Sequence, residues 1–327
     1  MLFNVRHSTR FRYSQPVRES IMEVRMHPRT EGKQRCLSFS LTVSPRARVS
    51  SFVDHVGNNV EQFDIATQHR TLSIVADAVV DVQAPDPLPD ALPAAAWQAL
   101  DDDVATQDFW EFLEPSEFVH DSQLLEGLRA ELGVRREADP LTLLRRLNTQ
   151  LYEWFDYAPS STRVDSSIDD ALAQRKGVCQ DFTHVMLALL RPLGVPARYV
   201  SGYVMQRDGG YRSLRGASHA WVEAYLPGPG WIGLDPTNNL LPGEKHVRTA
   251  VGRDYADVPP TRGVFKGAAE SELKVVVVVT PYNAPLLPDE IEAEAEWEKA
   301  RAAAAAPGGE DEDDDGQLEA QQQQQQQ

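Results

Sequence analysis

The stretch that decides the fold reads GVCQDFTHVMLALLRPLGVPARYVSGY, residues 177–203. Its middle part repeats apolar residues with the 3.6-residue period of an amphipathic helix, and Gly194 then stops the pattern. The periodic positions are Phe182, Val185, Met186, Leu189, Leu190 and Leu193. Because Leu187 and Ala188 widen this apolar surface, the sequence predicts a central, well-covered helix. A strand over residues 197–205 is predicted to follow it.

Cys179, one of only two cysteines in the chain, stands directly before this helix. A cysteine at a helix N-terminus is a candidate nucleophile, because the free N–H groups and the helix dipole favour a thiolate. Gly177 allows a sharp backbone turn and leaves room for a substrate. The alternative is a buried cysteine that caps a core helix. We interpret the other cysteine, Cys36, as inert core filler.

A predicted hairpin supplies the partners that a thiol nucleophile needs. His219 begins an alternating apolar and polar segment that ends at residue 226, and the loop PGPG that follows is typical of a turn. The returning strand, residues 231–235, ends at Asp235. The alternative for His219 is a half-buried histidine on the polar face of a strand.

The register of that hairpin can be tested by arithmetic. If Tyr225 faces Trp231, opposite residues sum to 456, and His219 faces Thr237. Asp235 then lies one diagonal step from His219, at a Cβ separation of about 7–8 Å or somewhat less. Imidazole and carboxylate side chains together span that distance. The spacing therefore favours a histidine–aspartate pair, which a one-residue slip would separate.

Three segments together resemble the core motifs of the transglutaminase-like superfamily. They are GVCQDF (177–182), SHAWVE (218–223) and WIGLDPT (231–237), and the helix-to-strand crossing LGVPARYVSGY (193–203) is similar too. The resemblance is closest to bacterial members with an N-terminal β domain, where Arg12-Tyr13 and GRDYADVPP (252–260) also match. It covers roughly residues 1–283.

The resemblance implies an α+β fold with a papain-like core, preceded by a small antiparallel β domain. It implies that Cys179 is the nucleophile, His219 the base and Asp235 the residue that orients the base, in an acyl transfer through a thioester. Trp221 and Gln180 are candidates for the substrate site. Animal-type transglutaminases carry tryptophan where Gln180 stands, and no calcium loop is found, so calcium-activated cross-linking is not expected.

Composition divides the chain into four predicted parts. Residues 1–83 alternate in short strand-like runs and form the β domain. Residues 84–138 start as a proline-rich linker and continue as a weakly helical segment. Residues 139–287 form the catalytic core and include a final valine-rich strand, which we expect to be buried. Residues 288–327 are acidic, alanine-rich and glutamine-rich, and they are predicted to be disordered.

Two helix starts are expected inside the core. Asp139-Pro140 reads as an N-cap followed by proline at the first helical position, with Leu144, Leu147 and Leu151 at helical spacing behind it. Ser167 and Asp170 resemble a capping box that starts a short helix ending near residue 177.

Charge and composition limit the classes of partner that the protein is expected to bind. A formal net charge of −17 without a basic stripe in the central portion argues against nucleic acid. The longest apolar run, residues 275–279, is far too short to cross a bilayer, so no membrane partner is expected. We expect a cytoplasmic protein that acts on a peptide or protein substrate. We expect no cofactor, and the oligomeric state stays open.

The expected reaction is hydrolysis, by a peptidase or amidase. Three alternatives remain. The first is a protein-glutamine transglutaminase, in which an amine resolves the thioester. The second is a metal site built from Cys179, His184, His219 or Asp235, although we predict no metal. The third is a catalytically silent binding module.

Overall fold

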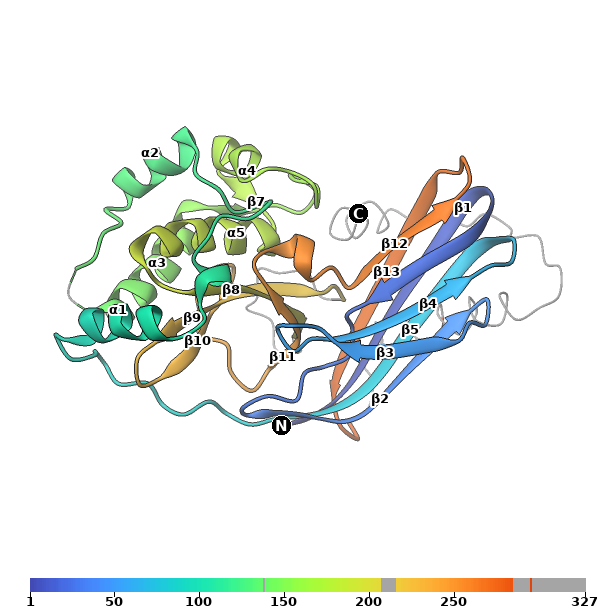
Figure 1. Ribbon diagram of the computed structural model, residues 1–327, viewed down its shortest axis with the longest axis horizontal. Helices are drawn as coiled ribbons and strands as arrows, with labels where there is room; N and C mark the ends of the chain where they lie inside the picture. Colours follow the sequence, from blue (N-terminus) through green and yellow to red (C-terminus); the bar gives the residue numbers. More distant parts are fainter. Residues whose placement is uncertain (138, 207–215, 285–294, 296–327) are drawn as a thin grey trace.

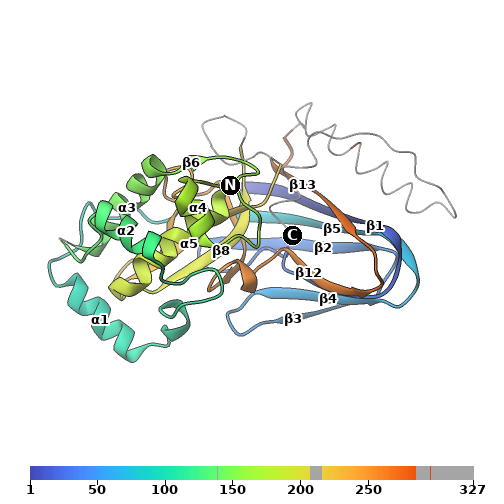
Figure 2. The same cartoon turned by 90° about the horizontal axis from the view of Figure 1, so that it is seen from above.

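The structure is a computed structural model that describes residues 1–137, 139–206, 216–284 and 295. A long β-sheet forms one half of the molecule, and a smaller sheet wrapped by helices forms the other (Figures 1 and 2). The sequence predicted this α+β arrangement. In Figure 1 the four strands β8–β11 lie between the helices and the long sheet.

The long sheet is antiparallel and is built around β1. Its described strands run in the order β2-β5-β1-β4-β3, and β12 and β13 also pair with β1. Their bounds are β1 Leu2–Val24, β2 Gln34–Ser44, β3 Val49–Val53, β4 Asn59–Ile65, β5 His69–Val82, β12 Thr261–Lys266 and β13 Ser271–Pro281. The first five strands confirm the predicted N-terminal β-rich segment, whereas the last two come from the other end of the chain.

The second half contains the helices and an antiparallel sheet of order β10-β9-β8-β11. The helices are α1 Ala96–Thr106, α2 Gln123–Glu131, α3 Pro140–Trp154, α4 Ile168–Gln174 and α5 Cys179–Leu190. The strands are β8 Ala197–Val204, β9 His219–Leu226, β10 Gly230–Leu234 and β11 His246–Gly252, with a short pair β6 Asp156–Tyr157 and β7 Lys176–Gly177. Three 3₁₀ turns in the described residues are η1 Trp110–Phe112, η2 Arg191–Leu193 and η3 Tyr255–Asp257.

The expected helix starts are confirmed. The carboxylate of Asp139 accepts the N–H groups of Leu141 and Thr142, and Pro140 is the first residue of α3. Ser167 and Asp170 form the reciprocal capping box of α4. That helix ends at Gln174, three residues before the predicted end, and its C-cap residue Arg175 takes the left-handed conformation.

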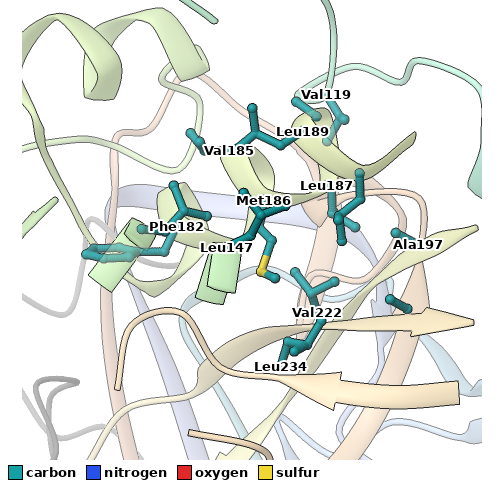
Figure 3. Close-up of a cluster of buried hydrophobic side chains, with 14 of the residues drawn as sticks. Val119, Leu147, Phe182, Val185, Met186, Leu187, Leu189, Ala197, Val222 and Leu234 are labelled. Carbon is teal, nitrogen blue, oxygen red and sulfur yellow. The ribbon is translucent and has the colours of Figure 1, made fainter. Parts of the chain in front are cut away.

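The core of the second half lies between α5 and one face of the smaller sheet. Every residue of α5 is buried, as its apolar pattern predicted. Figure 3 shows Met186 and Leu187 above Val222 and Leu234, whose strands form the floor of this core. On β9 the inward residues are Ala220, Val222, Ala224 and Leu226.

The other face of the smaller sheet is also covered. Trp221 packs there with Val200 and Val251, and Val56 from the long sheet's half contacts this cluster. The buried Glu223 pairs with Arg198 (2.7 Å) and Arg248 (3.0 Å). The sequence indicated a polar strand face here, because the residues that cover it are distant in the chain.

The valine-rich strand differs from its prediction in two ways. Residues Phe3 to Tyr13 of β1 pair with Pro281 to Ser271, so β13 belongs to the long sheet instead of the catalytic core. Its residues alternate between buried and half-buried instead of being buried throughout. The first and last described strands therefore pair in one sheet, and the expected boundary of the core at residue 287 is too late.

Two smaller differences from the predictions concern the burial of Cys36 and the start of helix α1. Cys36, expected in the core, lies half-buried on β2. Helix α1 begins at Ala96, inside the stretch that its prolines marked as linker.

The predicted tail, residues 288–327, lies outside the described residues except for residue 295. Within the described chain, no helix combines the length and apolar character needed to span a membrane.

Candidate active site

Helix α5 begins at Cys179, with Val178 as its N-cap residue. The carboxylate of Asp181 reaches back and accepts the Val178 N–H (2.7 Å) and the Thr162 hydroxyl (2.6 Å). Burial raises the pKa of Asp181 from 3.8 to about 6. This side chain thus holds the first turn and leaves Cys179 at the helix N-terminus, as the sequence predicted.

The role expected for Gly177 is different in the structure. A Cβ atom at this position would lie 2.6 Å from Cβ of Asp181 and 2.7 Å from its Oδ2. The space beside Gly177 is therefore filled by the side chain that holds the helix start, and it is not free for a substrate. Gly177 is also absent from the glycines with positive φ among the described residues, so the requirement is steric.

The hairpin has the register that its spacing predicted. Tyr225 pairs with Trp231 and Val222 with Leu234, so that opposite residues sum to 456. His219 is the first residue of β9, and Asp235 follows the last residue of β10. His219 Nε2 lies 2.8 Å from Asp235 Oδ2, which is a hydrogen bond between charged partners.

Asp235 is fully buried and has several donors. The side-chain amide of Asn238 donates to its Oδ2 at 2.8 Å, and the backbone N–H of Asn238 donates to Oδ1 at 3.2 Å. His246 Nε2 lies 3.3 Å from the same Oδ2. A carboxylate that accepts this many hydrogen bonds is held in one orientation and stays ionised.

The pKa values of the pair move in opposite directions. Burial would lower the pKa of His219, but the charge and hydrogen bond of Asp235, together with Cys179, raise it from 6.5 to about 10. Burial would likewise raise the pKa of Asp235, but His219 and His246 hold it well below its usual range. The site therefore holds an imidazolium and a carboxylate at neutral pH.

The second ring nitrogen of His219 is the one available for chemistry. Its Nδ1 atom is buried and has no hydrogen-bond partner among the described residues. Cys179 adds to the raised pKa of His219 through a hydrogen-bonding interaction and its charge, so the thiol lies beside this imidazole, although beyond ordinary hydrogen-bond reach of Nδ1. Cys179 is 6% exposed and His219 is 3% exposed, so both groups lie in a largely dehydrated environment.

The two substrate-site candidates have structural contacts. The amide of Gln180 donates to the Val164 carbonyl at 2.9 Å, which holds the 162–164 loop beside the helix start. Trp221 is fully buried, and its ring stacks on that of His219 at a centroid distance of 6.0 Å. In this conformation Trp221 supports the histidine from behind and offers no surface to a substrate.

Sequence reasoning missed His246. This residue begins β11 and is buried beside Asp235, but no motif marks it and β11 was not predicted. The strand pairs with β8, where His246 opposes Val204, and the two residues are too far apart in the chain for hairpin arithmetic. Gly202, which opposes His219 on β8, is a second missed position, because a Cβ there would lie 2.6 Å from Trp221.

Among the described residues, one group of atoms could hold a metal ion. His219, Asp235 and His246 each offer one ligand atom, all within 4.8 Å of one another. The two Nε2 atoms lie 2.8 Å and 3.3 Å from Asp235 Oδ2, which are hydrogen-bond distances. We therefore interpret the group as hydrogen-bonded. His184, an earlier candidate ligand, accepts the Tyr255 N–H instead.

Comparison with known proteins decides the family. Residues 3–81 match the bacterial transglutaminase-like N-terminal region, and residues 129–236 match the transglutaminase-like superfamily. An uncharacterized protein of Mycobacterium leprae is 33% identical over 280 residues, which cover 84% of this chain and 96% of the relative. This chain belongs to the transglutaminase-like superfamily. The resemblance inferred from the three motifs is confirmed.

Two further comparisons concern this transglutaminase-like protein. The crystal structure of a candidate cysteine protease from Cytophaga hutchinsonii is 25% identical, with a TM-score of 0.67 over 88% of this chain and 93% of that one. It supports the transglutaminase-like, papain-like fold. The protein-glutamine gamma-glutamyltransferase of Pseudomonas aeruginosa is 36% identical over 136 residues, covering 38% of this chain and 20% of that enzyme.

Proposed function

We propose that this protein is a cysteine peptidase or amidase that cleaves a peptide or isopeptide-like amide through a thioester on Cys179. The orientation of His219 carries the proposal. Its Nε2 atom is bonded to Asp235, whereas Nδ1 has no partner among the described residues and lies on an imidazole that Cys179 influences. This arrangement of base and orienting acid is the one that activates a thiol.

The reaction follows from these contacts. The Cys179 thiolate attacks the amide carbonyl carbon, and the N–H groups at the start of α5 stabilise the oxyanion. His219 gives its Nδ1 proton to the leaving nitrogen as the C–N bond breaks. The neutral imidazole then takes a proton from water, and the resulting hydroxide attacks the thioester. Loss of the thiolate releases the acid, and the ion pair is restored.

Water is the proposed second substrate. The likeness to a candidate cysteine protease extends along most of both chains, which favours hydrolysis. A protein-glutamine transglutaminase is the second candidate, in which a primary amine resolves the thioester. The match to the Pseudomonas aeruginosa gamma-glutamyltransferase favours it, although that match spans a fifth of the enzyme. Both reactions use the same thioester.

The two candidates differ in their products. The protein is incubated with glutamine-containing peptides and a fluorescent primary amine, and mass spectrometry counts hydrolysed product against amine adduct. We expect hydrolysis to dominate and to disappear in Cys179→Ala. Predominant adduct formation that also requires Cys179 would replace the peptidase with the transferase. Turnover that survives in Cys179→Ala would refute both.

A further inference from the structure

One carboxylate oxygen accepts hydrogen bonds from two buried imidazole rings. Asp235 Oδ2 lies 2.8 Å from His219 Nε2 and 3.3 Å from His246 Nε2. We propose that His246 is a positioning residue, which acts through Asp235 to keep His219 aligned with Cys179. The inference rests on the proposed function, since it assigns a role in that same site to a residue outside the three motifs.

The proton inventory of the site supports this role. A carboxylate oxygen only accepts hydrogen bonds, so both Nε2 atoms must carry a proton. Burial lowers the pKa of His246 from its usual value, with Asp235 opposing this shift and His219 adding to it. His246 is therefore a neutral donor at physiological pH, whereas His219 is charged. Without His246, a fully buried charged oxygen would lose one of its donors.

Ring packing fixes the direction of the bond. The His246 ring meets the Trp221 ring edge-on at a centroid distance of 5.2 Å and an interplanar angle of 81°. Trp221 also stacks on the ring of His219, and the centroids of the two imidazole rings lie 6.2 Å apart. Trp221 thus contacts both rings that share the carboxylate. Neither imidazole can turn without disturbing this packing.

The backbone of β11 is held from outside the core sheet. Gln34 accepts the Arg248 N–H and donates to the Arg248 carbonyl, both at 2.8 Å. The same carbonyl accepts the Arg29 N–H at 3.0 Å. These bonds join β11 to the half of the molecule that contains the long sheet. His246 lies two residues before Arg248 on the same strand. It therefore links Asp235 to a strand that is hydrogen-bonded to the N-terminal β domain.

The test uses the thiol itself and needs no substrate. In a Cys36→Ser background, the rate of Cys179 alkylation by iodoacetamide is measured across the pH range for four chains. These are the background itself, His246→Leu, His246→Gln and His219→Ala. We expect His246→Leu to slow alkylation roughly tenfold at neutral pH, the scale of one hydrogen bond to a charged group. Its pH profile should shift toward that of His219→Ala.

The glutamine variant separates positioning from packing. Its side-chain amide can still donate to Asp235, so His246→Gln should restore most of the rate. If His246→Leu and the background share one rate profile while His219→Ala differs, His246 is structural only and the inference is overturned. If His219→Ala also leaves the profile unchanged, the proposed function fails as well. Should His246→Leu not fold, the comparison passes to His246→Asn, whose shorter amide does not reach the carboxylate.

Discussion

The two ring nitrogens of His219 have different surroundings. One is bonded to a buried carboxylate, and the other has no partner among the described residues. The sequence could predict this pair because a tight hairpin fixes its own register. It could not predict His246 or Gly202, because each meets the site through strand pairings between segments that no short turn connects.

The raised pKa of His219 makes a prediction about stability. The folded chain holds this proton more tightly than the unfolded chain, with a pKa of about 10 against 6.5. The stabilisation is therefore complete below pH 6.5 and is lost as the pH rises toward 10. Over that range the melting temperature of the wild type should fall more steeply than that of His219→Gln. Parallel curves would show that His219 is not protonated in the folded state.

The start of α5 is the element that positions Cys179, the proposed nucleophile. Its apolar period could be predicted from the sequence and is found, but α5 ends at Leu190, and the 3₁₀ turn η2 continues to the left-handed Gly194 where the stop was predicted. The bond from Val178 to the Asp181 carboxylate could not, because Asp181 fits an exposed first-turn acid equally well. Only the packing of Asp181 against Gly177 and Thr162 shows that it is buried.

Gly177→Ala tests this element. The added methyl group must displace Asp181, so we expect a loss of stability of about 1–3 kcal/mol, the range for overpacking a buried site. The rate at which Cys179 is alkylated should also change in this variant. The measurement is chemical denaturation.

Gly127→Ala is the matched control for this substitution. Gly127 lies within α2, and a Cβ there would meet no atom within 4 Å. This change should stabilise the protein by about 0.4–1 kcal/mol, because alanine favours the helix. The same destabilisation at both positions would refute the steric account of Gly177.

At the scale of the whole molecule, the first and last described strands pair with each other in the long sheet. β13 pairs with β1 along eleven residues, and the buried bond from His7 to the Tyr203 hydroxyl (2.8 Å) joins β1 to the smaller sheet. Glu31 approaches Arg198 at 3.5 Å and links the long sheet to the buried pairs of Glu223. A linear division of the sequence could not reveal this, because a valine-rich strand carries no information about which sheet it joins.

Two shortened chains test this arrangement. A chain that ends at Pro288 keeps β13, so its melting temperature should match that of the full chain. A chain that ends at Gly267 loses the buried side chains of Leu273, Val275 and Val277. At about 1.5–3 kcal/mol each, these contribute a large share of a typical stability of about 5–15 kcal/mol, so this chain should not fold. Circular dichroism decides, and a folded chain ending at Gly267 would refute the closure by β13.

The central claim is that Cys179, served by His219 and Asp235, is the nucleophile. The most direct measurement is labelling with an electrophilic peptide amide analogue, followed by mass mapping of the modified residue. The account predicts one adduct, on Cys179, which is absent in Cys179→Ala and forms much more slowly in His219→Ala. Labelling on the half-buried Cys36, or an unchanged rate in His219→Ala, would contradict it.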